Sequence, residues 1–60
     1  MKKTKIIQSI INLTISENWK GNKADQEREN LRKYWNKESK ESCRDQLTQL
    51  QEAETEFYNQ

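Results

Sequence analysis

The first candidates for chemistry in this sequence are its ten carboxylates and its one thiol, Cys43. The chain contains no histidine, so the commonest general base and the commonest nitrogen ligand of metal ions are both missing. A cysteine nucleophile needs a neighbouring base, and one cysteine among carboxylates does not make a zinc site at these spacings. The carboxylates stand among Lys and Arg and not in an apolar stretch that would suit them to acid–base catalysis. The sequence therefore predicts a protein without enzymatic activity, cofactor or metal.

Four cations form the other pattern with a chemical use. They recur at the helical spacing i, i+4, i+7 and i+11, and they are Lys33, Lys37, Lys40 and Arg44. On one continuous helix they would form a ridge of the kind that contacts nucleic-acid phosphates. The pI of the chain is about 7.8, whereas a basic binding domain usually exceeds about 9. A homodimeric nucleic-acid-binding regulator is therefore the alternative hypothesis, and it requires that the helix be unbroken.

Charge is unevenly distributed along the chain, although the net charge is only +1. Residues 1–44 hold all 11 Lys and Arg and six acids, a net charge of +5, whereas residues 45–60 hold four acids and no cation, a net charge of −4. Glu52, Glu54 and Glu56 fall near the end of the last predicted helix, where the helix dipole favours cations. We expect Lys or Arg of a neighbouring helix or of a partner protein to face these acids.

The five aromatic residues exceed what a small core can easily hide, because only 30% of the chain is hydrophobic. Exposed Trp and Tyr are the usual anchors of protein interfaces. A helix face cannot bury both members of an adjacent pair, so Tyr34 and Tyr58 are expected to be exposed, while core packing is the plain alternative for Trp35. The predicted protein-binding residues are Tyr34, Trp35, Phe57, Tyr58, Glu52, Glu54 and Glu56.

The elements that must position these residues are predicted to be helices. Residues 22–58 contain no Gly and no Pro and are rich in helix-forming residues. A first helix over 4–19, with Thr4 as its N-cap, places five apolar residues on one stripe: Ile6, Ile7, Ile10, Ile11 and Leu13. Ile11, Leu13 and Ile15 also alternate as in a strand, but no other segment is available to pair with one.

Two breaks divide the predicted helices. Gly21, the only glycine, is placed as the residue that ends the first helix, and Asn22 as the N-cap of the next, so that a short link makes the two helices antiparallel. Residues 36–42 are polar, and they separate an apolar face with Ala24, Leu31, Tyr34 and Trp35 from a second face with Cys43, Leu47, Leu50, Phe57 and Tyr58. Ser42 with Asp45 has the spacing of a capping box.

We therefore expect an all-α fold in one small domain spanning residues 1–60, a three-helix bundle with helices at about 4–19, 23–38 and 42–58. The alternative is a helical hairpin in which one long second helix leaves half its length uncovered and dimerises through it. A domain this small is marginally stable alone, so a partner subunit or target is expected to add stability.

Composition also limits the location and the class of function. No apolar run reaches the length of about 18 residues that a membrane span needs. The first helix, with Lys2, Lys3 and Lys5, resembles an in-plane amphipathic helix, but its stripe is also what a core helix requires. A single cysteine and the lack of a signal-peptide cleavage site favour the cytoplasm. The predicted function is a small protein-binding module, an accessory factor or inhibitor that occupies a surface on a larger partner. Its Lys-, Asn- and Ile-rich composition is compatible with an AT-rich bacterial or phage genome.

Overall fold

The computed structural model describes the backbone of residues 2–58 and the side chains of residues 2–55. Within this part of the chain there are three α-helices and no strand: α1 (Lys3–Thr14), α2 (Asn22–Lys37) and α3 (Lys40–Tyr58). The predicted all-α three-helix fold is confirmed. The alternative of one long helix after Gly21 is wrong, because Glu38 takes an extended conformation and interrupts it.

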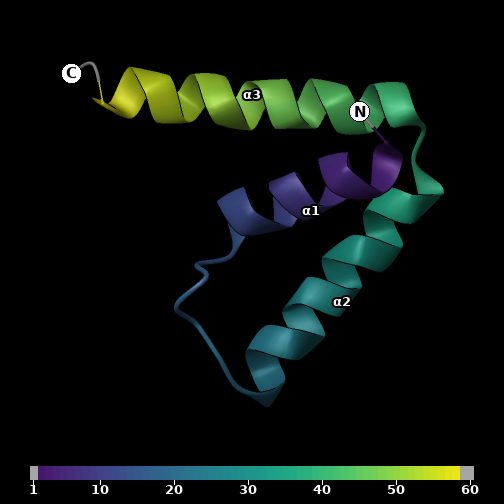
Figure 1. Ribbon diagram of the computed structural model, residues 1–60, viewed down its shortest axis with the longest axis vertical. Helices are drawn as coiled ribbons and strands as arrows, with labels where there is room; N and C mark the ends of the chain where they lie inside the picture. Colours follow the sequence, from purple (N-terminus) through teal and green to yellow (C-terminus); the bar gives the residue numbers. More distant parts are fainter. Residues whose placement is uncertain (1, 59–60) are drawn as a thin grey trace.

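Helix α1 lies between the other two helices and packs on both of them (Figure 1). It runs beside α3 and in the same direction, whereas α2 crosses it obliquely on the way back. Helices α2 and α3 diverge from the two-residue link at 38–39. The chain does reverse between α1 and α2, as predicted, but through a seven-residue link, residues 15–21, and not through a tight turn.

The core is built mainly by α1. Four of its side chains are at most 2% exposed, and they occupy one stripe of the helix: Ile6, Ile7, Ile10 and Ile11. Against them pack Leu31 and Trp35 of α2 and Cys43, Leu47 and Leu50 of α3. Leu13, which the sequence also placed on the stripe, is 38% exposed. At 100° per residue Leu13 lies within about 20° of the buried Ile6, so its exposure follows from its place in the last turn of α1, which ends at Thr14.

The predicted end of the first helix at Trp19 is wrong, because α1 ends at Thr14. Thr14, Ile15 and Ser16 are all weak helix formers. Ile15 turns to an extended conformation with φ −117° and ψ 128°, and there its side chain is buried. Burial of Ile15 in the link therefore replaces the last turn of the expected helix.

Both predicted caps of the first two helices are also wrong. Lys2, and not Thr4, precedes α1, and no side chain caps that end. Gly21, and not Asn22, is the N-cap residue of α2, so it begins the second helix and does not end the first. Its φ of +121° lies in a region that residues with a Cβ atom rarely adopt. This backbone conformation explains why the only glycine of the chain stands here.

The break between α2 and α3 falls where the sequence predicts it. The N-cap residue of α3, however, is Ser39 and not Ser42. The backbone N–H of Ser42 donates a hydrogen bond to Ser39 Oγ at 3.1 Å, and the N–H of Cys43 donates to the carbonyl oxygen of Ser39 at 3.1 Å. Ser39 is therefore the N-cap residue of α3, and Ser42 is the third residue of the helix.

Replacement of Ser39 by alanine is expected to lower the free energy of unfolding by about 1 kcal/mol, because the first turn of α3 loses its side-chain acceptor. Urea unfolding followed by circular dichroism measures the loss. Ser42→Ala is the matched control, because it keeps the backbone N–H that Ser39 Oγ caps and removes only the contact between Ser39 Oγ and Ser42 Oγ at 3.1 Å. Its effect should be smaller than that of Ser39→Ala, below about 0.5 kcal/mol. Equal losses in the two variants would contradict the cap.

Candidate protein-binding surfaces

Tyr34 is an exposed aromatic side chain whose ring contacts the ring of its neighbour Trp35. It is 56% exposed on α2, whereas its neighbour Trp35 is partly buried and packs against the core. The two rings meet edge to face with their centroids 4.9 Å apart, a favourable arrangement of aromatic quadrupoles. The expected exposure of Tyr34 is confirmed, and Trp35 is at least in part a core residue.

The backbone of Trp35 joins the end of α2 to α3. Its carbonyl oxygen accepts the backbone N–H of Glu38 at 3.2 Å and the thiol of Cys43 at 3.4 Å. Cys43 is fully buried, so it acts as a small core residue with a weak donor. Trp35, which contacts Tyr34, is thus held in place both by packing on the core and by hydrogen bonds to its backbone carbonyl oxygen.

The predicted binding residues Glu52 and Glu54 belong to the C-terminal part of α3, which projects beyond α1 (Figure 1). Residues 51–55 are all exposed, Glu52 and Glu54 among them. The ion pairs among the side chains of residues 2–55 are Asp25–Arg28 and Glu29–Arg32, both within α2. The expected cation from a neighbouring helix therefore does not face Glu52 or Glu54 within this part of the chain. The side chains of Glu56, Phe57 and Tyr58 lie outside the described residues.

The predicted basic ridge is divided by the break at 38–39. Lys33 and Lys37 are on α2, whereas Lys40 and Arg44 are on α3, and the two helices diverge from this point. Lys40 and Arg44 line an open groove together with Glu41, Asp45 and Thr48, so two carboxylates stand beside these two cations. The structure thus does not bring the four cations onto one helix.

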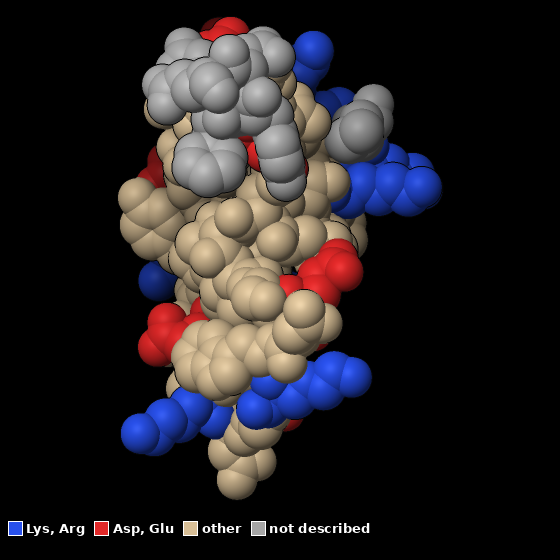
Figure 2. Space-filling model, turned by 90° about the vertical axis from the view of Figure 1, so that its left-hand side faces the viewer, with Lys and Arg blue, Asp and Glu red and all other residues tan. Residues whose placement is uncertain are grey.

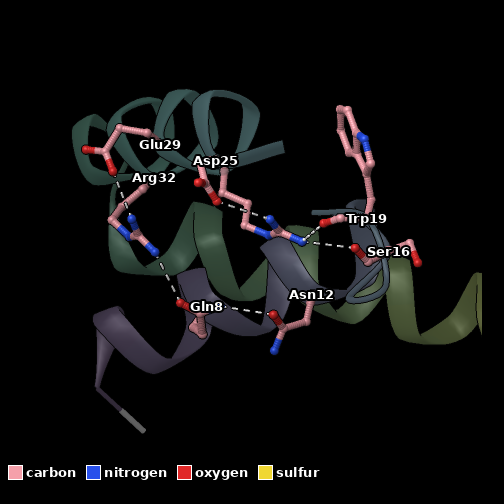
Figure 3. A network of polar contacts seen from close by, with 8 residues as sticks. Gln8, Asn12, Ser16, Trp19, Asp25, Glu29 and Arg32 are labelled. Carbon is pink, nitrogen blue, oxygen red and sulfur yellow. Dashed lines mark hydrogen bonds and ion pairs between the residues drawn. The ribbon is translucent and has the colours of Figure 1, made fainter. Parts of the chain in front are cut away.

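A polar network holds the link of residues 15–21 against α2 (Figure 3). Arg28 Nη2 donates to the carbonyl oxygens of Ser16 at 3.1 Å and Trp19 at 2.6 Å, and Arg28 Nη1 lies 3.6 Å from the Asp25 carboxylate. Within the link, the N–H of Trp19 donates to the Ser16 carbonyl at 3.1 Å, and the N–H of Asn18 donates to Ser16 Oγ at 3.2 Å. These bonds hold the link in place although it has no regular secondary structure.

A second set of polar contacts joins α2 to α1. Arg32 donates to Glu29 at 3.0 Å and to Gln8 Oε1 at 3.4 Å, and Gln8 Nε2 donates to Asn12 Oδ1 at 3.0 Å. At the other end of α2, Lys3 Nζ donates to the carbonyl oxygen of Asn36 at 2.9 Å. A cation at this position also complements the negative end of the helix dipole of α2.

Trp19 is the exposed aromatic residue that sequence reasoning left out of the predicted sites. Its side chain is 43% exposed and points away from the other residues drawn in Figure 3. The sequence predicted Trp19 as the last residue of the first helix and counted it only among the five aromatic residues that a small core cannot easily hide. The run of weak helix formers from Thr14 to Ser16 is the signal that it lies in a link instead.

The described residues were searched for membrane spans and metal sites, and the chain was compared with known proteins. None of the described helices is long and apolar enough to cross a lipid bilayer. Within the described residues, no three Cys, Asp or Glu side chains gather as metal ligands would. A scan against protein-family models and searches of curated proteins and of solved structures each found no match to this chain.

Proposed function

We propose that this chain is a small non-enzymatic protein-binding module of the cytoplasm, an accessory factor or inhibitor that acts by occupying a surface on a larger partner protein. The observation that carries the proposal is the 56% exposure of Tyr34 above a Trp35 that packs on the core. An exposed, pre-positioned tyrosine is a typical interface anchor, since it offers apolar area and a hydroxyl group at a small cost in side-chain entropy.

The surroundings of Tyr34 indicate the chemistry of the partner. Lys33 and Lys37 precede and follow it on α2, and both are exposed. A matching surface would hold the phenol ring in an apolar pocket and place carboxylates around the rim. Charges at the rim chiefly raise the rate of association and select among partners, whereas the buried aromatic ring supplies most of the affinity.

Affinity capture tests this proposal. The immobilised full chain, exposed to a lysate of the cells that encode it, is expected to retain a specific protein that the Tyr34→Ala variant loses. The affinity for that protein should fall by about 30-fold or more, as for a typical hot spot. Glu27→Ala, at another exposed position of α2, is the matched control and should retain the protein. A captured protein that binds the Tyr34→Ala variant equally well would contradict the proposal.

Nucleic-acid binding has less support, because the cations predicted for it are divided between two diverging helices. The same purified chain separates the two functions. Binding to phosphates is strongest at low salt, so a mobility-shift assay at about 50 mM salt is the sensitive condition. We expect no shift of duplex or single-stranded DNA or RNA. A shift that disappears on reversing the charge of Lys40 and Arg44 would favour the alternative.

A further inference from the structure

The link between α1 and α2 holds Lys20, which in the described part of the chain is the only Lys or Arg that stands between two helices. The link between α2 and α3 consists of Glu38 and Ser39 alone. Residues 16–23 are all exposed. They lie at the edge of the molecule, on the side away from the link between α2 and α3 (Figure 1), and Figure 2 looks onto this edge: Lys and Arg side chains stand out from the surface at the level where α2 begins. Another protein can therefore reach Lys20 from solvent.

The peptide bond that joins Lys20 to Gly21 is not held by hydrogen bonds. On one side of it, Arg28 donates to the carbonyl oxygen of Trp19 at 2.6 Å. On the other side, the carbonyl oxygen of Gly21 accepts the N–H of Asp25 at 3.0 Å. Between these two contacts, neither the Lys20 carbonyl oxygen nor the Gly21 N–H has a hydrogen-bond partner among the described residues. A methyl group on the Cα atom of Gly21 would meet no atom within 4 Å beyond its chain neighbours, so the bond lies in open space.

From these observations we infer that the Lys20–Gly21 bond is a cleavage site for a lysine-directed protease, and that cutting it switches the module off. Such a protease binds an exposed, non-helical segment and holds the lysine ammonium group against a carboxylate in its S1 pocket. Hydrolysis consumes one water molecule and breaks the bond between the Lys20 carbonyl carbon and the Gly21 nitrogen. The carbon gains the oxygen and becomes a carboxylate, and the nitrogen gains both protons and becomes an ammonium group.

The other Lys and Arg residues of the described chain are poorer substrates. Except for Lys2, they all lie within helices, and helical backbone has to unfold locally before a protease can bind it. Lys37 and Lys40 flank the short link, but Ser39 Oγ caps the start of α3 there at 3.1 Å. Lys2 precedes α1, and a cut after it leaves all three helices joined.

The cut after Lys20 separates the helix that builds the core from the rest of the chain. Helix α1 packs on both other helices, and after the cut only non-covalent contacts hold it there. A short tether keeps a segment at an effective concentration in the millimolar range, and the cut removes this advantage. Helix α1 has 12 residues, and an isolated helix of this length is marginal in water. The new ammonium group of Gly21 is also repelled by the positive end of the α2 dipole.

The cut chain should therefore be folded only at high concentration. Because a domain of this size has little stability in reserve, we expect the two pieces to be mostly associated at about 100 μM and mostly separate and unfolded at about 1 μM. The native chain is one covalent piece, so its folding does not depend on concentration. Loss of the fold ends binding to the partner, a consequence that rests on the proposed function, whereas the cut and the unfolding do not.

Limited digestion of the full chain with trypsin, which cuts after both Lys and Arg, tests the site. Mass spectrometry is expected to identify residues 1–20 and 21–60 as the first products of an internal cut. The Lys20→Gln variant should lose this cut, and its half-life in trypsin should be at least about 10-fold longer, because every other internal site requires helix unfolding. Lys23→Gln is the matched control: it removes the same charge at an exposed position inside α2 and should be cut like the native chain. Circular dichroism checks that both variants fold.

Dilution of the cut chain tests the switch. The native chain is digested briefly at about 100 μM, where the pieces stay together, and trypsin is then inhibited. The helical circular dichroism signal per residue should fall when this sample is diluted to about 1 μM and should return when it is concentrated again. The native chain without trypsin should keep its signal at both concentrations.

Two kinds of outcome would overturn the inference. A first internal cut at any other Lys or Arg, or a Lys20→Gln variant that is digested as fast as the native chain, would show that the link is not the cleavage site. A cut chain that keeps its helical signal at about 1 μM would show that the core holds α1 without the link, so that cutting is no switch. None of these outcomes depends on the partner proposed for Tyr34.

Discussion

Replacement of Ile11 by alanine is expected to leave most of the chain unfolded at 25 °C. Ile11 is fully buried at the centre of the core cluster, and truncating such a side chain costs about 2–5 kcal/mol. A domain of this size rarely has more than about 3–5 kcal/mol of stability in total. Circular dichroism at 222 nm and urea unfolding measure the loss, and one-dimensional proton NMR shows whether dispersed methyl signals remain.

The effect is large because, in the part of the chain that the structure describes, only α1 packs extensively on both of the other helices. Helices α2 and α3 diverge and contact each other little, so each depends on α1 for its place. Leu13→Ala, on the same helix but at a position that is 38% exposed, is the matched control and should cost less than about 1 kcal/mol. A loss below about 1 kcal/mol for Ile11→Ala would mean that α1 does not hold the fold together.

The parts of the fold that were predictable from the sequence are those set by local signals. The isoleucine stripe of α1 follows from helical periodicity, and its four buried members were identified as a group. The break after α2 follows from a polar stretch that contains a usable cap, and it was placed within a few residues of Ser39. The exposure of Tyr34 beside Trp35 follows from adjacency, since a helix turns neighbouring side chains by 100°.

The parts that were not predictable depend on contacts between distant residues. The weak helix formers Thr14 to Ser16 indicate an early end of α1, but the path of the link and the place of Trp19 in it are fixed by Arg28. This residue bonds to carbonyl groups nine and twelve residues earlier in the chain. No local pattern indicates such a bond. The role of Gly21 was misread for a related reason, because a glycine after an apparent helix is usually its end, and only the early termination of α1 makes it the start of α2.

Replacement of Arg28 by alanine is expected to lower the free energy of unfolding by about 1.5–3 kcal/mol, because hydrogen bonds from a charged donor are stronger than neutral ones. Two carbonyl oxygens of the link lose their donor, at Ser16 and Trp19. Urea unfolding measures the stability. Amide hydrogen exchange measures the local effect. The N–H of Trp19, which bonds to the Ser16 carbonyl, should exchange faster in Arg28→Ala than in the native chain, and its exchange should increase more than that of the amides of the α1 core.

Two further variants separate the geometry of this contact from its charge. Arg28→Lys keeps the positive charge but replaces a planar guanidinium group with a single ammonium group. The lysine should not bridge both carbonyl groups, so this variant should lose most of the stability that Arg28 contributes. Arg32→Ala removes an arginine one turn further along α2 whose partners are the exposed side chains of Gln8 and Glu29, and it should cost less than about 1 kcal/mol. Equal losses for Arg28→Ala and Arg32→Ala would show that the link does not depend on Arg28.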